Sequence, residues 1–283
     1  MKIGMNLLLW ATHVTEEHFP IIAKLKQTGF DGVEIPIFEG DDNHYKWLRK
    51  ELDKQGLGCT TVGLMTPEAN PISPDPALRH AAVERFRRLI GWTAILGGDL
   101  MAGPFHSPLG VFSGEPPTED EKKRGADVFR KAADEARKAG MRLAIEYLNR
   151  FECYFLTTAA DTRAMVMRVD HAHFRMMYDT FHANIEEKSP AKAIAECADS
   201  FIHVHVSEND RGTPGTGMVH WDETFAALRK ACYDGWLTIE SFGRALPALA
   251  AATKVWRDLF PSAENVYTQG LRFIKEKWAS AGK

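Results

Sequence analysis

Four short segments in the second half of the chain each place a metal-binding side chain directly after a short apolar run. The side chains are those of Glu146, Asp179, His205 and Glu240. Three carboxylates and one imidazole form an oxygen-rich set that suits Mn²⁺, Mg²⁺ or Co²⁺, whereas a thiolate-rich or histidine-rich set would indicate zinc. The sequence therefore predicts a site for a hard divalent cation, with Mn²⁺ as the first expectation and Co²⁺ or Mg²⁺ as alternatives.

Such a site could move protons as well as hold a metal. Three carboxylates overcompensate the charge of a divalent cation, so their free oxygens keep enough basicity to take part in proton transfer. Chelation of a ketone oxygen and the neighbouring hydroxyl would acidify the C–H bond between them and stabilise an enediolate. If Glu146 and Glu240 act on opposite faces of the substrate, the stereocentre inverts. Proton shuttling on a single face would instead interconvert an aldose and a ketose.

Eight strands are expected to position these side chains. Apolar runs of four to seven residues recur along the chain, and longer helical patterns separate them. The predicted strands are 2–8, 31–36, 58–64, 98–102, 141–146, 174–178, 201–206 and 236–240. The predicted helices are 15–28, 42–56, 76–96, 118–139, 158–168, 190–198, 222–232 and a long terminal stretch, 247–278.

The alternation favours an α/β fold with a single (β/α)8 TIM barrel over an open doubly wound sheet. An open sheet would carry a glycine-rich phosphate loop after its first strand, and the segment Leu9-Trp10-Ala-Thr-His13 contains no glycine. No Pro-, Gly- or Ser-rich linker divides the chain. We therefore expect one barrel domain over 1–283 with a helical extension at its C-terminus.

Side-chain parity predicts that the four ligand candidates meet. In a barrel, catalytic groups lie at the C-terminal ends of the strands, and side chains alternate between the interior and the helices. Each candidate shares its strand face with the residue two positions earlier, in the pairs Ala144 and Glu146, Met177 and Asp179, His203 and His205, and Thr238 and Glu240. All four are thus expected to face the barrel axis at its mouth. We expect His203, one layer deeper, to support the site rather than bind the metal, and Glu34 to be a buried polar partner or a pocket residue.

Composition limits the classes of partner. The chain has 283 residues, of which 45% are hydrophobic and 26% charged, with a net charge of −3. Because no run of Lys and Arg marks a nucleic-acid or membrane surface, we expect neither partner, and a small neutral or mildly polar substrate is the default.

The cysteines and the N-terminus indicate a cytoplasmic protein. Four scattered cysteines form no C-x-x-C pair and no dense disulfide framework. The apolar first ten residues are too short for a signal peptide, and no later segment approaches the roughly 20 apolar residues of a spanning helix.

The segments around the candidate residues closely resemble the ketose 3-epimerases, the D-tagatose, D-psicose (allulose) and L-ribulose 3-epimerases of the xylose-isomerase-like barrel superfamily. The resemblance spans nearly the whole chain. It rests on Glu146-Tyr-Leu-Asn-Arg-Phe-Glu152, Asp179-Thr-Phe-His-Ala-Asn-Ile-Glu-Glu187, the run from His205 to Arg211, Gly215-Thr-Gly217 and Lys254-Val-Trp-Arg-Asp258.

The resemblance implies specific roles. Glu146, Asp179, His205 and Glu240 match the family's metal ligands, and Glu146 and Glu240 match its acid/base pair, which works through a cis-enediolate. Glu152, His182 and Arg211 match its contacts to the O1–O3 end of a ketose substrate. The resemblance also implies a homodimer or homotetramer.

The far end of the pocket differs from that pattern. His106 and Trp10 follow the fourth and first predicted strands and are further candidates for lining the substrate pocket. Val14 and Leu109 stand where sugar 3-epimerases of the family often carry aromatic residues. These positions would contact the sugar beyond C3, so the sequence leaves the choice of ketose open.

Other functions are weighed against this one. An aldose–ketose isomerase or an inosose-type dehydratase could use the same scaffold. A DNA-repair phosphodiesterase resembling endonuclease IV would need many more histidine ligands and a basic face, and the chain has neither. A barrel that only binds sugar is disfavoured because every acid/base and ligand position is occupied.

Overall fold

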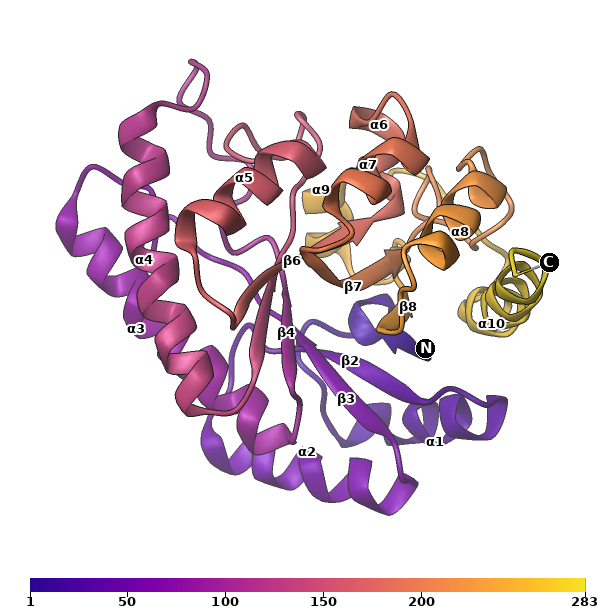
Figure 1. Ribbon diagram of the computed structural model, residues 1–283. Helices are drawn as coiled ribbons and strands as arrows, with labels where there is room; N and C mark the ends of the chain where they lie inside the picture. Colours follow the sequence, from indigo (N-terminus) through magenta and orange to yellow (C-terminus); the bar gives the residue numbers. More distant parts are fainter. Residues whose placement is uncertain (283) are drawn as a thin grey trace.

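Eight parallel strands close into a barrel in the computed structural model, which describes residues 1–282 (Figure 1). The strands follow one another around the barrel in sequence order, and β8 pairs with β1. This confirms the predicted TIM barrel. The strands are β1 (Lys2–Asn6), β2 (Gly32–Pro36), β3 (Gly58–Val62), β4 (Leu100–Gly103), β5 (Arg142–Ile145), β6 (Phe174–Asp179), β7 (Phe201–Val206) and β8 (Trp236–Ile239).

Helices surround the barrel (Figure 1). They are α1 (Phe19–Thr28), α2 (Asp42–Gln55), α3 (Pro76–Leu96), α4 (Glu119–Lys138), α5 (Ala159–Val169), α6 (Thr180–Glu186), α7 (Pro190–Cys197), α8 (Trp221–Lys230), α9 (Pro247–Thr253) and α10 (Ala263–Ser280), with short 3₁₀ turns η1 (Leu7–Leu9) and η2 (Glu16–His18). Helix α4 begins as predicted, because Thr118 accepts from the amide of Glu121 and the Glu121 carboxylate accepts from the amide of Thr118. No helix in residues 1–282 combines the length and apolarity needed to cross a bilayer.

Two parts of the chain differ from the prediction. The continuous terminal helix is wrong: Lys254 takes a left-handed conformation with φ of 61° after α9, and Ser262 caps a new helix, α10. Pro261 between them also opposes a continuous helix, because proline lacks an N–H donor. Helix α6 was not predicted, since its seven residues are too few to show a helical period.

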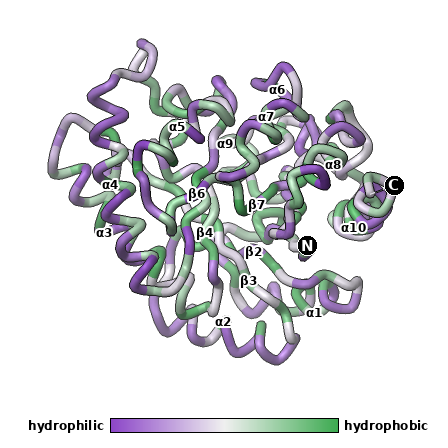
Figure 2. The backbone as a smooth tube through the Cα atoms, in the orientation of Figure 1, coloured by the Kyte–Doolittle hydropathy of each residue, from purple (hydrophilic) through white to green (hydrophobic). Residues whose placement is uncertain are grey.

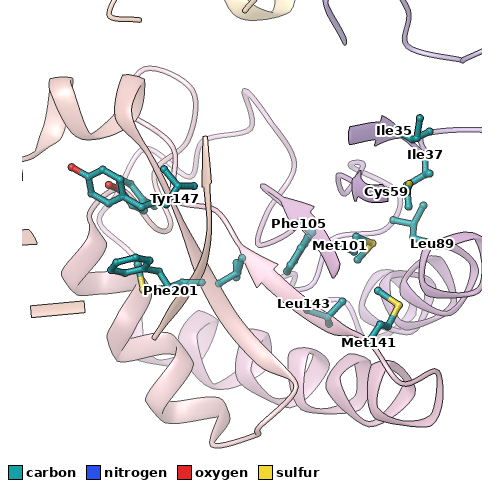
Figure 3. Packing of buried hydrophobic residues seen from close by; sticks show 14 of the residues in the cluster. Ile35, Ile37, Cys59, Leu89, Met101, Phe105, Met141, Leu143, Tyr147 and Phe201 are labelled. Atoms are coloured by element: carbon teal, nitrogen blue, oxygen red, sulfur yellow. The ribbon is translucent and has the colours of Figure 1, made fainter. Parts of the chain in front are cut away.

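Side-chain parity along the strands is confirmed by packing. The helix-facing residues of the strands belong to the large core cluster between barrel and helices, part of which Figure 3 shows around Met101, Phe105 and Leu143. Figure 2 shows the hydrophobic strands inside and hydrophilic stretches on the outer helices. The axis-facing residues form a separate small cluster made of Leu100, Ala102, Ala144 and Met177. The barrel is therefore filled from the inside, and its polar groups gather at one end.

A tryptophan occupies the barrel interior below the polar end. Trp236 lies on β8 opposite His203 on β7 and is buried. Gly32 makes room for its ring, because a Cβ at position 32 would lie 2.5 Å from the Trp236 ring and 2.5 Å from the carbonyl oxygen of Gly58. Glycine on β2 is thus needed for close approach within the barrel.

Candidate metal centre and active site

The four predicted ligand residues meet at the C-terminal end of the barrel. Glu146 follows β5, Asp179 ends β6, His205 lies on β7 and Glu240 follows β8. One oxygen or nitrogen from each lies within 4.8 Å of those from the other three, and all four side chains are buried. The fold therefore gathers three carboxylates and one imidazole into a single cluster, as parity predicted.

The donor atoms are arranged as a cation would require. Nδ1 of His205 has no hydrogen-bond partner and lies 3.3 Å from Glu240 Oε1, 3.5 Å from Asp179 Oδ2 and 3.9 Å from Glu146 Oε1. Asp179 Oδ2 also lacks a partner. Buried polar atoms without partners are costly, so their convergence on one point fits a divalent cation, and the oxygen-rich donor set suits a hard one.

Asp179 serves the local fold as well as the cluster. Its Oδ1 accepts hydrogen bonds from the amides of Phe181 at 2.6 Å and His182 at 3.3 Å, and so caps helix α6. The other oxygen, Oδ2, is the one directed toward His205. At the junction of β6 and α6, one oxygen of Asp179 thus caps the helix and the other faces the carboxylate–histidine cluster.

The two glutamates of the cluster have different environments. Burial, followed by the negative charges of Glu240 and Asp179, raises the pKa of Glu146 well above its usual value, although His205 opposes this. Burial would also raise the pKa of Glu240, but the charges of His205 and Arg211 outweigh it and lower that pKa. The charges around Glu146 and Glu240 therefore differ, although both side chains face the same cluster.

Arg211 lies against the cluster. Its Nη1 donates to Glu240 Oε2 at 2.7 Å and to Ser207 Oγ at 3.1 Å. The guanidinium carbon lies 3.7 Å from the ring centre of Phe181 and 4.8 Å from that of Phe242. Two aromatic rings and a carboxylate therefore hold this buried cation in a fixed orientation.

A buried glutamate shapes the loop that carries Arg211. Arg211 adopts a left-handed backbone with φ of 67°, which is uncommon for a residue other than glycine. Glu208, fully buried, accepts hydrogen bonds from the amides of Gly215 and Val219 and from the indole of Trp221. These bonds close the loop around its own carboxylate and support the conformation at Arg211.

His182 and Glu152 stand beside Arg211. Nε2 of His182 lies 3.2 Å from Arg211 Nη2 and 3.7 Å from Glu146 Oε1. Its Nδ1 lies 3.0 Å from the amide of Asn149; this amide and Arg211 Nη2 are both donors, and the neutral ring can accept from only one of them. Burial lowers the pKa of His182 to about 3, which keeps the ring neutral. Asn149 also donates to Glu152 Oε1 at 2.8 Å.

A cavity opens over these residues. On one side it is lined by Glu146, Glu152, His182, Arg211 and Glu240. The rest of its lining is mostly apolar and includes Leu8, Phe38, Val62, Leu64, Leu109 and Phe242. The cavity is therefore lined by the two acid/base candidates, Glu146 and Glu240, and by three of the five predicted substrate contacts.

The other two predicted substrate contacts do not line this cavity. Trp10 packs against the hydrophobic core, with its ring centre 6.2 Å from that of Tyr267. His106 is fully buried, and its Nδ1 lies 2.8 Å from Ser107 Oγ. Their substrate-binding roles stay predictions. Leu109 does line the cavity, whereas Val14 lies in the core.

Sequence reasoning missed several polar residues that support the site. Asn149 and Glu208 lie within the motifs that carry the family resemblance but have no predicted role of their own, and Asn6 lies in a predicted apolar strand. Asn6 is buried and donates to Glu240 Oε1 at 3.2 Å. Parity could have found it, because Gly4 and Asn6 share one face of β1.

Comparisons with known proteins place the chain in a family. Residues 22–277 match the family model of the xylose isomerase-like TIM barrel. The chain is 31% identical to a probable ketose 3-epimerase of Synechocystis sp., over 98% of this chain and 97% of that one. It is 33% identical to the D-psicose 3-epimerase of Agrobacterium fabrum, over 93% of each chain.

A solved structure agrees with these matches. The D-allulose 3-epimerase from Methylomonas sp., in complex with D-allulose, superposes with a TM-score of 0.92 at 26% identity and covers 98% of this chain and 97% of that one. With full-length matches in sequence and fold, and with a buried carboxylate–histidine cluster at the barrel mouth, the chain belongs to the ketose 3-epimerases, the sugar isomerases of the xylose isomerase-like TIM barrel family.

Proposed function

We propose that this protein epimerises a free ketose at C3, with a divalent cation, Mn²⁺ in the first place, held by Glu146, Asp179, His205 and Glu240. The observation that carries the proposal is the convergence of these four buried side chains on one point, which brings the two glutamates, Glu146 and Glu240, to the same site. These glutamates follow β5 and β8, and β6 and β7 stand between them, so they can approach a substrate from different sides.

The chain's own residues would divide the proton transfer between them. One glutamate removes the C3 proton, and the other delivers a proton to the opposite face of the resulting cis-enediolate. The bound cation would act as a Lewis acid on the ketone oxygen and the neighbouring hydroxyl. Either glutamate can begin, because an epimerisation runs in both directions.

Three further residues would hold the reacting end of the sugar. Arg211 can donate to the oxygens on which negative charge develops and is already oriented by Glu240, and His182 lines the same cavity. Glu152 lines the same wall and can accept hydrogen bonds from sugar hydroxyls. Because these groups are held in place before the reaction, little free energy is spent on reorganising them as the transition state forms.

The cavity lining favours an unphosphorylated sugar. Among the described residues, Arg211 is the only cationic side chain that lines the cavity over the carboxylate cluster, and Glu240 already neutralises its charge. Much of the remaining lining is apolar and includes Leu8, Phe38 and Leu109. A phosphate on the sugar tail would therefore enter this cavity without a counter-charge.

Solvent exchange tests the proposal. The protein loaded with Mn²⁺ is incubated with a panel of free ketohexoses and ketopentoses in D₂O, and products are separated by chromatography. We expect a 3-epimer carrying deuterium at C3, and loss of both product and label in Glu146→Gln and Glu240→Gln. Epimerisation without solvent label would show the mechanism to be wrong, and an aldose product would identify an aldose–ketose isomerase instead. Light scattering of the same sample measures the expected homodimer or homotetramer, which stays a prediction.

A further inference from the structure

A second polar layer lies directly beneath the proposed metal ligands. It consists of Asn6 on β1, Glu34 on β2 and Thr60 on β3, which stand side by side because Asn6 pairs in register with Glu34 and Glu34 with Thr60. His203 on β7 faces the same space. All four are buried, and Glu34 and His203 are completely so.

The Glu34 carboxylate is surrounded by donors. Its Oε1 accepts from His205 Nε2 at 2.7 Å and from Asn6 Nδ2 at 3.0 Å. Its Oε2 accepts from Thr60 Oγ1 at 2.9 Å, and His203 Nε2 lies 2.9 Å from the same oxygen. A buried carboxylate is retained only when its oxygens are satisfied, and four neighbours from β1, β3 and β7 surround this one.

The contact between Glu34 and His205 determines which way the imidazole faces. Since Nε2 donates to Glu34, the ring presents Nδ1 to Glu146, Asp179 and Glu240. Metal-binding histidines depend on such a bond at their other nitrogen, which fixes both the tautomer and the ring orientation. Without the bond, the ring of His205 could rotate about its side-chain dihedrals.

Asn6 connects this layer to a proposed acid/base residue. Its Oδ1 accepts from the amide of Leu8 at 2.9 Å, so its Nδ2 must face the carboxylates. That nitrogen donates to Glu34 Oε1 at 3.0 Å and to Glu240 Oε1 at 3.2 Å. The side-chain amide of Asn6 therefore bridges two carboxylates: that of Glu34, which orients His205, and that of Glu240, which is proposed to transfer a proton.

We propose that Glu34 and Asn6 are positioning residues of this enzyme: Glu34 holds His205 so that Nδ1 faces the metal, and Asn6 ties Glu34 to Glu240. The inference rests on the proposed metal-binding roles of His205 and Glu240. It concerns residues that do not touch the metal or the substrate and act through those that do.

Calorimetric titration of the metal-free protein with Mn²⁺ tests the role of Glu34. In Glu34→Gln we expect Mn²⁺ affinity to fall by about 10–100-fold, the range for loss of such an outer contact. At saturating Mn²⁺ we expect kcat to fall while KM for the ketose stays within about twofold, because the substrate contacts are unchanged. A purely structural role would lower the unfolding temperature of the metal-free protein and leave Mn²⁺ affinity unchanged.

Two neighbouring threonines of β3 provide a matched pair. Thr60→Val removes a hydrogen bond to Glu34, whereas Thr61→Val removes one to Thr93 of helix α3 at 2.7 Å. Both side chains are buried and the substitution is the same, so only the first is expected to weaken Mn²⁺ binding. This pair also serves if Glu34→Gln fails to fold.

A double-mutant cycle tests the connection through Asn6. We expect the effects of Asn6→Ala and Glu34→Gln on kcat to be less than additive, because they interrupt one network. Additive effects would overturn the part of the inference that concerns Asn6.

Three outcomes would overturn the part that concerns Glu34. The first is a Glu34→Gln variant whose Mn²⁺ affinity and kcat equal those of the wild type. The second is equal weakening in Thr60→Val and Thr61→Val. The third is a wild type that binds two Mn²⁺ ions and a Glu34→Gln variant that binds one, since Glu34, His203 and His205 would then be ligands of a second ion. A wild type that binds no Mn²⁺ would overturn the proposed function together with this inference, whereas normal wild-type binding with unaffected variants would overturn the inference alone.

Discussion

Asp179 offers a way to separate metal binding from folding within one side chain. Its Oδ1 caps helix α6 through the amides of Phe181 and His182, and its Oδ2 faces the proposed metal position. Asp179→Asn keeps an oxygen that can accept both capping bonds and replaces the charged ligand oxygen by an amide nitrogen. Asp179→Ala removes both functions.

The two variants should therefore differ in stability and agree in metal binding. Loss of a cap costs about 1 kcal/mol. For a chain of this size, this lowers the unfolding temperature of the metal-free protein by roughly 2–4 °C. We expect this loss in Asp179→Ala and not in Asp179→Asn. Both variants remove the same negative charge, so the difference in unfolding temperature between them reports the cap alone.

Both measurements are made on the same preparations. Thermal unfolding in the presence of EDTA is followed by circular dichroism, and Mn²⁺ binding is measured by calorimetry. Loss of a ligand should weaken Mn²⁺ binding in both variants by more than the roughly 10–100-fold expected for an outer contact. Wild-type affinity in Asp179→Asn would refute Asp179 as a ligand. Equal unfolding temperatures for Asp179→Asn and Asp179→Ala would refute the capping argument.

Three further predictions concern the metal, the barrel interior and the Arg211 stack. Mn²⁺ at about 100 times its dissociation constant should stabilise the fold by ~2.7 kcal/mol, which raises the unfolding temperature by roughly 5–11 °C. Scanning calorimetry with and without EDTA measures this shift. An unchanged unfolding temperature would contradict tight binding of Mn²⁺ to the folded state. Gly32→Ala should destabilise the protein by about 1–3 kcal/mol because its Cβ would meet the Trp236 ring, whereas Gly91→Ala in α3, where nothing lies within 4 Å, should be neutral or stabilising in urea unfolding. Phe181→Leu removes a ring 3.7 Å from the Arg211 guanidinium. This change should lower kcat/KM by roughly 2–30-fold, the equivalent of about 0.5–2 kcal/mol. Wild-type kinetics in this variant would show that the stack of Phe181 on Arg211 does not orient the guanidinium.

The sequence predicts the barrel and the ligand cluster because both follow from local patterns. Each strand is a short apolar run, and parity along it decides which side chains face the axis, so the meeting of Glu146 and Glu240 follows once eight alternations are recognised. Helix α6 was missed because it is only seven residues long and depends on a cap from Asp179. The break between α9 and α10 differs from the prediction because the left-handed turn at Lys254 has no signal in residue type, and Pro261 is the one helix breaker between the two helices.

The contacts that orient the ligands could not be predicted in the same way. Asn6 and Glu240 are 234 residues apart in the chain, and their hydrogen bond depends on closure of the barrel between β1 and β8. Glu208 likewise acts through amides that become neighbours only when its loop folds. Such roles arise from long-range geometry, which residue type alone does not reveal.

The two halves of the barrel thus contribute differently to the site. Strands β5 to β8 supply the metal and acid/base candidates at their ends, and strands β1 to β3 supply the polar layer of Asn6, Glu34 and Thr60 that supports them. A ligand at a strand end stands next to a polar loop, so its segment reads as a motif. A supporting residue is a single polar side chain inside an apolar strand, where burial makes it costly unless it is bonded. An inward-facing Asn, Glu or Thr near the end of an early barrel strand is therefore itself a signal of a supported site: parity places Asn6, Glu34 and Thr60 on the barrel axis, and closure of the barrel decides which partner each one bonds.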